Sequence, residues 1–336
     1  MIRNETLDGW RGFLALWVVV GHILLFSNIN VLILTAPGYA VDGFIFLSGY
    51  FIQASLEGIS KKSTGLKSIK VFYLYRFMRT WPIYCIILGI YFFSTLLSLN
   101  GFSLSQITIS SEKLYVLFLN LFLLNGFSQQ LVSSIPIPSW SLSLEFQFYV
   151  IYPSIFLFKL YKSYYFIFLT FIIALIAPII FGHGAIDGSI AHFVFPSILP
   201  FRLFHFMLGA VWYNNYRTPN YKFLLFCLLG MFIVNVYTSM LILVIYFTNL
   251  EFFSSLNIFK TKILQFFGRI SYSLYLIHFP ILLASDMLFL MLKLDINKLM
   301  FISIFTLSIS TALSYFSFDL IEQRFISMGK KLAKSF

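Results

Sequence analysis

The chain has 336 residues, of which 60% are hydrophobic and only 10% are charged, and its formal net charge is +11. Soluble globular domains carry charge on about a quarter of their residues, so this composition excludes one and predicts an all-α, polytopic integral membrane protein. The positive charge does not indicate nucleic-acid binding, because lysine and arginine are scattered between apolar segments. Cys85 and Cys227 lie in apolar stretches and provide no disulfide framework.

Segments long and apolar enough to cross a bilayer follow one another along the whole chain. We expect about ten transmembrane helices, at residues 7–28, 39–57, 71–98, 139–158, 164–182, 196–216, 221–236, 238–254, 271–292 and 298–322. A further apolar segment at residues 114–125 is about 12 residues long, which is short for a crossing. We find no internal repeat and no long linker, so residues 1–336 are expected to form a single membrane domain without a separate soluble domain.

The distribution of cations predicts how these helices are oriented. If residues 114–125 do not cross and the N-terminus is cytoplasmic, the outer side keeps only four of the 23 lysine and arginine residues, namely Lys113, Arg202, Lys293 and Lys298. If that segment does cross, every later loop changes sides and the cations become almost evenly divided. Cytoplasmic loops of membrane proteins are enriched in lysine and arginine, so the first arrangement is favoured and both termini are expected to be cytoplasmic.

Arg11 and His22 share one face of the first predicted span. Eleven residues separate them, so at about 100° and about 1.5 Å per residue they point the same way, about 16 Å apart along the helix. In a hydrocarbon core about 30 Å thick, a helix that holds Arg11 at the cytoplasmic surface carries His22 past the midplane. An ionisable side chain at that depth is a functional hypothesis by default.

The predicted topology places two carboxylates in the same outer layer as His22. Asp42 lies near the outer end of the second span, and Glu145 lies one to two turns below the outer surface in the fourth. Arg76 and Arg79 lie with Arg11 at the opposite, cytoplasmic mouth. Because Arg76 and Arg79 are three residues apart on a helix, they share a face.

Six sequence motifs follow in a characteristic order over nearly the whole chain. They are L-D-G-W-R-G-F-L-A-L-W-V-V-V-G-H (Leu7 to His22), V-D-G-F-I-F-L-S-G-Y-F-I (Val41 to Ile52), R-F-M-R-T-W-P-I-Y (Arg76 to Tyr84), W-S-L-S-L-E-F-Q-F-Y-V-I-Y-P (Trp140 to Pro153), F-G-R-I-S-Y-S-L-Y-L-I-H (Phe267 to His278) and S-Y-F-S-F-D-L-I-E-Q-R-F (Ser314 to Phe325). Together they resemble the membrane acyltransferase family 3, bacterial polytopic enzymes similar to sugar O-acetyltransferases.

The resemblance implies a multi-pass enzyme of the bacterial inner membrane. Such an enzyme takes an acyl group from cytoplasmic acyl-CoA, here expected to be acetyl-CoA, and passes it to a hydroxyl of a surface polysaccharide or lipid-linked sugar. Arg11 and His22 would be the family's paired arginine and histidine, and Arg76 with Arg79 its cytoplasmic arginine pair. No bound cofactor is implied, because acyl-CoA is a co-substrate. The expected partners are acyl-CoA, the glycan acceptor and membrane lipid.

The chemistry of the residues supports the same interpretation. A hydroxyl that attacks a thioester needs a base near neutral pH, and His22 is the candidate. A carboxylate beside it would fix its tautomer and stabilise the imidazolium; Asp42 is the first candidate for this role and Glu145 the second. A covalent acyl-histidine relay is an open alternative to direct transfer. The guanidinium groups of Arg11, Arg76 and Arg79 suit the phosphates of CoA.

Each of these residues also has a purely structural interpretation. His22 and Glu145 can serve as hydrogen-bonding groups between helices, Arg11 can extend to the interface, and Asp42 can cap its helix. Arg76 and Arg79 can act only as determinants of topology.

Five further polar or aromatic residues are candidates for lining the same cavity: Trp140, Arg202, His205, His278 and Glu322. Arg202 and His205 can instead anchor lipid headgroups. His278 precedes Pro280, which frees backbone carbonyls that a nearby side chain can satisfy, and this favours a structural role. No metal site is expected, because the histidines of the outer loop, His183 and His192, are not convincingly spaced for one.

Two other classes of function compete with an enzyme. In a proton-coupled transporter or flippase of a glycan or lipid intermediate, His22, Asp42 and Glu145 would form a proton relay. The paired broken helices in two related halves that are typical of such transporters are missing here. A non-catalytic subunit of a glycan assembly complex is the third class, and the intact Arg11 and His22 argue against it.

Overall fold

The computed structural model describes residues 4–99, 111–128, 131, 135, 138–181, 197–217, 220–249, 258–293 and 296–335, and the regular structure of these residues is entirely helical. The main helices are α1 (Glu5–Phe26), α2 (Pro37–Ser60), α3 (Gly65–Leu99), α4 (Ser111–Leu121), α6 (Ser139–Leu157), α7 (Tyr164–Phe181), α8 (Leu203–Arg217), α9 (Tyr221–Val234), α10 (Val236–Thr248), α11 (Lys262–Leu292), α12 (Lys298–Ser317) and α13 (Gln323–Leu332). Short helical turns include η3 (Asn125–Phe127), η5 (Leu199–Phe201), η7 (Ile258–Lys260) and the π-helix η8 (Phe318–Glu322).

Four helical stretches of the described chain are long and apolar enough to cross a membrane: Glu5–Phe26, Tyr164–Phe181, Lys262–Leu292 and Lys298–Leu332. The remaining windows predicted as spans also overlap helices, although α8, α9 and α10 have only 15, 14 and 13 residues. Large apolar side chains face outward on these helices; on α7, for example, Tyr165 is 90% exposed and Ile179 is 81% exposed. Extended apolar surfaces of this kind are rare on soluble monomers. The chain is therefore an all-helical membrane protein.

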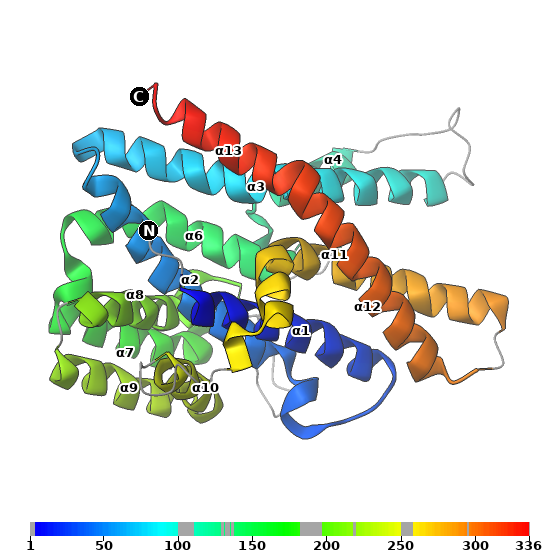
Figure 1. Ribbon diagram of the computed structural model, residues 1–336, viewed down its shortest axis with the longest axis horizontal. Helices are drawn as coiled ribbons and strands as arrows, with labels where there is room; N and C mark the ends of the chain where they lie inside the picture. Colours follow the sequence, from blue (N-terminus) through cyan, green and yellow to red (C-terminus); the bar gives the residue numbers. More distant parts are fainter. Residues whose placement is uncertain are drawn as a thin grey trace.

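The two ends of the described chain lie on the same side of the molecule. In Figure 1 the start of α1, the end of α2, the start of α3 and the end of α13 all lie toward the left. The charge distribution predicts this shared side. Whether that side faces the cytoplasm stays a prediction.

Helix α1 begins at a well-formed cap and packs most closely on α11. The side chain of Asn4 accepts a hydrogen bond from the backbone N–H of Leu7 at 3.2 Å, which satisfies one of the free donors at the helix start. Gly12 lies directly against α11: a Cβ atom there would stand 2.1 Å from the carbonyl oxygen of Leu264 and 2.8 Å from the nitrogen of Gly268. Backbones can approach this closely in a membrane only where small residues face each other. The glycines therefore set the α1–α11 spacing.

A second glycine contact joins α2 to α8. A Cβ atom on Gly49 would lie 1.9 Å from the carbonyl oxygen of Phe206, and one on Gly209 would lie 2.0 Å from that of Phe46. Around this contact the largest apolar cluster forms, with Phe148 stacked on Phe206 at a centroid distance of 4.1 Å. Helix α2, which carries several candidate site residues, is thus held between α1 on one side and α8 on the other.

The apolar segment at residues 114–125 forms α4 and the turn that follows it. Eleven residues of helix extend about 16 Å, roughly half of a hydrocarbon core about 30 Å thick. Its end is tied to α3, where Tyr84 donates to the carbonyl of Asn120 at 2.9 Å and Trp81 donates to that of Leu121 at 3.1 Å. The length of α4 agrees with the expectation that this segment does not cross the membrane by itself.

We predict that Gly12→Ala destabilises the protein by at least about 1–3 kcal/mol, because the added methyl group overlaps backbone atoms of α11 that cannot rotate away. The measurement is thermal unfolding of the detergent-solubilised protein. Gly58→Ala on α2 is the matched control, since a Cβ there meets nothing within 4 Å and alanine favours a helix over glycine by about 1 kcal/mol. Equal stability of the two variants would contradict the glycine-set spacing.

Candidate functional site

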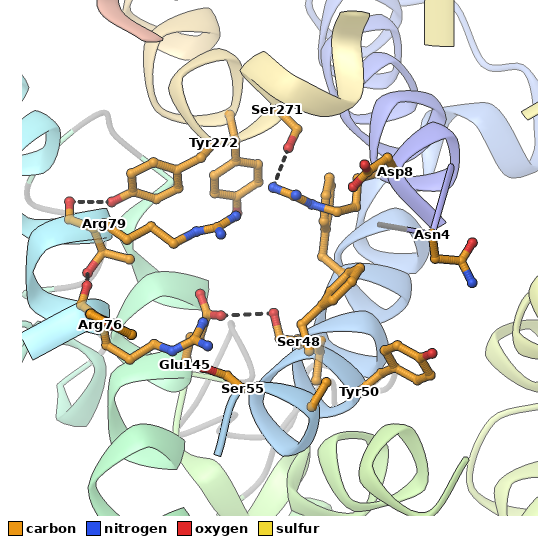
Figure 2. Close-up of a pocket in the computed structure, with 18 of the residues that line it drawn as sticks. Asn4, Asp8, Ser48, Tyr50, Ser55, Arg76, Arg79, Glu145, Ser271 and Tyr272 are labelled. Carbon is orange, nitrogen blue, oxygen red and sulfur yellow. Dashed lines mark hydrogen bonds between the residues drawn. The ribbon is translucent and has the colours of Figure 1, made fainter. Parts of the chain in front are cut away.

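A cavity of about 900 Å³ opens among α1, α2, α3, α6, α11 and α13. Its wall carries the guanidinium groups of Arg11, Arg76 and Arg79 and the carboxylates of Glu5, Asp8 and Glu145. Several of these side chains converge on one space in Figure 2. The exposed residues Lys260 and Lys330 lie at its rim, on the side of the molecule that holds the start of α1 and the end of α13. The cavity is thus open on the side that the charge distribution predicts to be cytoplasmic.

The three arginines reach the cavity from two helices. Arg11 on α1 donates to the hydroxyl of Ser271 on α11 at 2.9 Å, and its guanidinium lies 5.9 Å from the ring centre of Phe51. Arg76 on α3 lies 5.5 Å from the ring of Tyr149, and its Nε has no hydrogen-bond partner among the described residues. Figure 2 shows Arg76 and Arg79 both extending from α3 into the cavity. A buried N–H donor without a partner is costly unless a ligand supplies the acceptor.

Glu145 lies in this arginine-rich cavity and contacts α2. The hydroxyl of Ser48 donates to its Oε1 at 2.8 Å, as the dashed line in Figure 2 marks. Glu145 also interacts electrostatically with Arg11 and Arg76. Glu145, the second candidate after Asp42 for orienting His22, therefore has Ser48 and the arginines as its partners.

Glu322 balances the same charges from behind the cavity wall. It lies in the π-helix η8 and accepts a hydrogen bond from the hydroxyl of Ser273 on α11. It also interacts electrostatically with Arg79 and Arg11. Single π turns inside helices often occur at functional sites, and here the turn directs a buried carboxylate toward the arginines.

His22 pairs with His278, which sequence analysis did not foresee. The Nδ1 of His22 lies 2.9 Å from the carbonyl oxygen of Val18 and 3.2 Å from Nε2 of His278. Nδ1 of His278 lies 3.0 Å from the carbonyl oxygen of Leu274. His278 is fully buried, whereas His22 is partly buried.

The backbone contacts assign the tautomers of both rings. A carbonyl oxygen can only accept, so Nδ1 of each histidine carries a proton and donates to the carbonyl four residues earlier. Nε2 of neutral His278 is then an acceptor for the Nδ1–H of His22. The remaining nitrogen of His22, Nε2, has a free lone pair and can accept a proton. The carbonyl of Val18 and Nε2 of His278 thus both favour the Nδ1–H tautomer of His22.

The cavity ends about one helical turn short of the histidine pair. Tyr275 on α11 and Phe44 on α2 belong to its wall, with ring centres 6.3 Å apart. Tyr275 shares a hydrogen bond of 2.7 Å with Ser141 on α6, and its ring centre lies 6.0 Å from that of His278. Tyr275 therefore lies between the cavity and His278.

The prediction that Asp42 orients His22 is wrong. Asp42 is buried and accepts hydrogen bonds from Nε of Arg202 at 2.6 Å and from the hydroxyl of Thr238 at 2.9 Å. Nε2 of His205 lies 4.0 Å from its second oxygen. Arg202 directly precedes α8 and Thr238 lies in the first turn of α10, so the cluster joins α2 to these two helices. A buried carboxylate is stabilised more by a positively charged arginine than by a neutral imidazole, because a buried charge needs an opposite charge. Asp42 therefore pairs with Arg202.

The other cavity-lining candidates also lie outside the cavity wall. Trp140, Arg202, His205, His278 and Glu322 are all absent from the residues that line it. Trp140 packs against the main apolar cluster, and the remaining four belong to the pairs described above. Where the structure describes the chain, no group of three or more potential metal ligands gathers. The outer-loop residues His183 and His192 lie outside the described residues.

Sequence reasoning missed Ser48, Ser271 and Tyr275 as parts of the site. All three lie in the motif segments, but hydroxyl groups are common in membrane helices and no spacing rule singles them out. Tyr275 lies three residues before His278 on α11, and this helical spacing was a usable indication that the two share a face.

We predict that Asp42→Asn lowers the free energy of unfolding by about 3–5 kcal/mol, because it leaves the charge of Arg202 without its buried partner. Asp286→Asn is the matched control. Asp286 pairs with Lys298 at 2.7 Å, but its side chain is 25% exposed and that of Lys298 is 39% exposed, so we expect a cost below about 1 kcal/mol. Thermal unfolding in detergent measures both, and equal losses would contradict a stabilising role for the Asp42 cluster.

Comparison with known proteins identifies the family. A family model described as an acyltransferase domain, Acyl_transf_3, matches residues 4–316 and so covers nearly the whole chain. No curated protein and no solved structure matches the chain significantly. The matched residues include His22, His278 and all residues that line the cavity except Ile326 and Lys330 of α13. The chain is therefore an acyltransferase and belongs to the membrane acyltransferase family 3.

Proposed function

We propose that this acyltransferase moves an acyl group, in the first instance acetyl, from cytoplasmic acyl-CoA to a hydroxyl of a surface polysaccharide or lipid-linked sugar. The observation that carries the proposal is the cavity of about 900 Å³ whose wall holds three arginines and which opens beside α13. The proposal places the chain in the bacterial inner membrane with about ten crossings and both termini in the cytoplasm. The shared side of the two chain ends and the cation distribution support this topology.

The arginines suit the phosphate groups of the donor. Guanidinium groups bind phosphate oxygens in bidentate fashion, and such charge-assisted hydrogen bonds are about twice as strong as neutral ones. Arg76 offers a buried Nε–H that no described residue accepts. Glu145 and Glu322 offset part of the positive charge of the arginines. This reduces the electrostatic repulsion among the arginines when no donor is bound.

His22 is proposed as the general base. The acceptor hydroxyl approaches Nε2 of His22, which takes its proton while the hydroxyl oxygen attacks the thioester carbonyl carbon. The resulting imidazolium keeps its Nδ1–H on Val18 and His278. The carbon–sulfur bond then breaks, and the proton on His22 passes to the leaving CoA thiolate, so free CoA and the acyl ester are the products. His278 is a positioning residue in this scheme.

The donor's thioester would reach His22 along α11. Its phosphates lie at the arginines and its pantetheine arm extends past Ser141 and Tyr275 toward the histidine pair. Rotation of the Tyr275 side chain away from Ser141 breaks one hydrogen bond of 2.7 Å, which costs about 1 kcal/mol net. An acyl-histidine relay uses the same path, with His22 as nucleophile.

We predict that His22→Ala abolishes acylation while the protein still accumulates in membranes. Membranes incubated with labelled acetyl-CoA and the isolated glycan should release free CoA and form labelled ester with the wild-type protein but not with the variant. Loss of a general base accounts for a fall of at least about 10²-fold to 10⁴-fold.

His205→Gln is the control for this experiment, because His205 is also a histidine of the helical interior but lies in the Asp42 cluster, away from His22. Acetyl ester retained on the glycan in cells that carry His22→Ala would overturn the role of His22. A transporter would leave the labelled acetyl-CoA unconsumed even with the wild-type protein.

We predict that Arg79→Ala and Arg76→Ala each raise the KM for acyl-CoA by about tenfold to a hundredfold, since each removes a charge-assisted contact of about 1.5–3 kcal/mol. Arg269→Ala is the matched control, because Arg269 is exposed on α11 and does not line the cavity. Steady-state kinetics with varied acetyl-CoA measure the effect. A change confined to the KM for the acceptor would contradict the placement of the donor.

A further inference from the structure

Helix α13 is an amphipathic, basic helix at the mouth of the cavity. Together α12, η8 and α13 form one helical stretch of 35 residues, from Lys298 to Leu332. At about 1.5 Å per residue it is roughly 50 Å long, well beyond a hydrocarbon core about 30 Å thick. The family match ends at residue 316, so α13 lies outside the part of the chain that the match describes.

Helix α13 is seated on the turn of α3 that carries the arginine pair. Gly329 is buried there, and a Cβ atom on it would lie 3.1 Å from Cβ and Cγ of Met78. Met78 lies between Arg76 and Arg79 in sequence and belongs to the cavity wall. Figure 1 shows α13 running alongside α3. The close approach fixes where the residues next to Gly329 project.

One face of α13 forms part of the cavity rim. Ile326 and Lys330, four residues apart, both line the cavity, whereas the neighbouring Lys331 does not. Lys330 is exposed, and no described carboxylate pairs with it within 4 Å. An unpaired lysine at the rim of a cavity that holds three arginines extends the positive surface outward. An anion longer than one phosphate group fits this arrangement.

We propose that Lys330 binds the 3′-phosphate of the acyl-CoA donor, an inference that rests on the proposed function. The order of groups along CoA runs from thioester through pantetheine and pyrophosphate to the 3′-phosphorylated adenosine. With the thioester directed inward and the pyrophosphate at Arg11, Arg76 and Arg79, the 3′-phosphate lies at the rim. Lysine suits that exposed position because its ammonium group is a compact, hydrated point charge that needs no fixed geometry.

The alternative use of a basic amphipathic helix is to bind anionic lipid at the membrane surface. That use would involve Lys330 and Lys331 alike, because both are exposed in the last turn of α13. Both also interact favourably with the negative end of the helix dipole. The difference between the two lysines is that only Lys330 lines the cavity, and this difference makes Lys331 the matched control.

The test compares acetyl-CoA with acetyl-dephospho-CoA, which lacks the 3′-phosphate, as donors for the wild-type protein, Lys330→Ala and Lys331→Ala. We expect the wild-type protein to have a KM about threefold to tenfold higher for the dephospho donor. Lys330→Ala should raise the KM for acetyl-CoA by a similar factor, leave kcat unchanged and no longer distinguish the donors. Lys331→Ala should behave as the wild-type protein. Binding of CoA and dephospho-CoA, measured by calorimetry, should give the same ratios.

Several outcomes would overturn the inference, and each is distinct. If the wild-type protein uses both donors equally well, or if Lys330→Ala still distinguishes them, the 3′-phosphate is not bound by Lys330. If Lys330→Ala and Lys331→Ala raise KM equally, and only in vesicles that contain anionic lipid, α13 binds the membrane instead. If the wild-type protein transfers acyl from neither donor to any acceptor, the proposed function itself fails and this inference fails with it.

Discussion

The close contact between α1 and α11 is the constraint on which the site depends. Gly12 and Gly268 bring the two backbones together, and from that point the helices run side by side in the same direction. Arg11 therefore meets Ser271 near one end, and His22 meets His278 further along. Van der Waals packing of small residues is a main source of helix association in lipid, so the same glycines that stabilise the fold also set the register of the catalytic candidates.

The buried carboxylates described above each lie near a cation. These interactions divide the polar residues into two groups, the Asp42 cluster and the arginine-lined cavity. Asp42 is held by Arg202, whereas Glu145 and Glu322 interact with the arginines of the cavity. Burying a charge in a membrane protein is costly unless an opposite charge or several donors satisfy it. The histidine pair is the exception, because both rings can be neutral and each satisfies the other and a backbone carbonyl.

The sequence predicted the all-helical class and the positions of most described helices because these follow from apolar length and helical period. The depth of His22 in the membrane stays a prediction. The arginines of α1 and α3 gather in one cavity, as their predicted common side indicated. The partners of the polar residues could not be predicted. Layer depth places Asp42, Glu145 and His22 at similar heights, but it says nothing about rotation about each helix axis or about which helices are neighbours. Arg202 and His278, both more than 150 residues from their partners, become partners only through the glycine contacts.

The neutral partner of His22 has a chemical consequence. A carboxylate beside His22 would favour the protonated imidazolium form of the ring. A ring that is already protonated cannot take a proton from a hydroxyl group. The carbonyl of Val18 and Nε2 of His278 fix the same tautomer without adding charge, so Nε2 of His22 keeps its lone pair. In the proposed mechanism the positive charge that forms on His22 is stabilised by its hydrogen bond to His278, and it is lost again when His22 gives its proton to the leaving thiolate. In the proposed function the phosphates of the donor lie at the arginines of the cavity, and Tyr275 lies between that cavity and His278. This separation would allow one membrane domain to bind a polyanion and still keep the imidazole of His22 unprotonated.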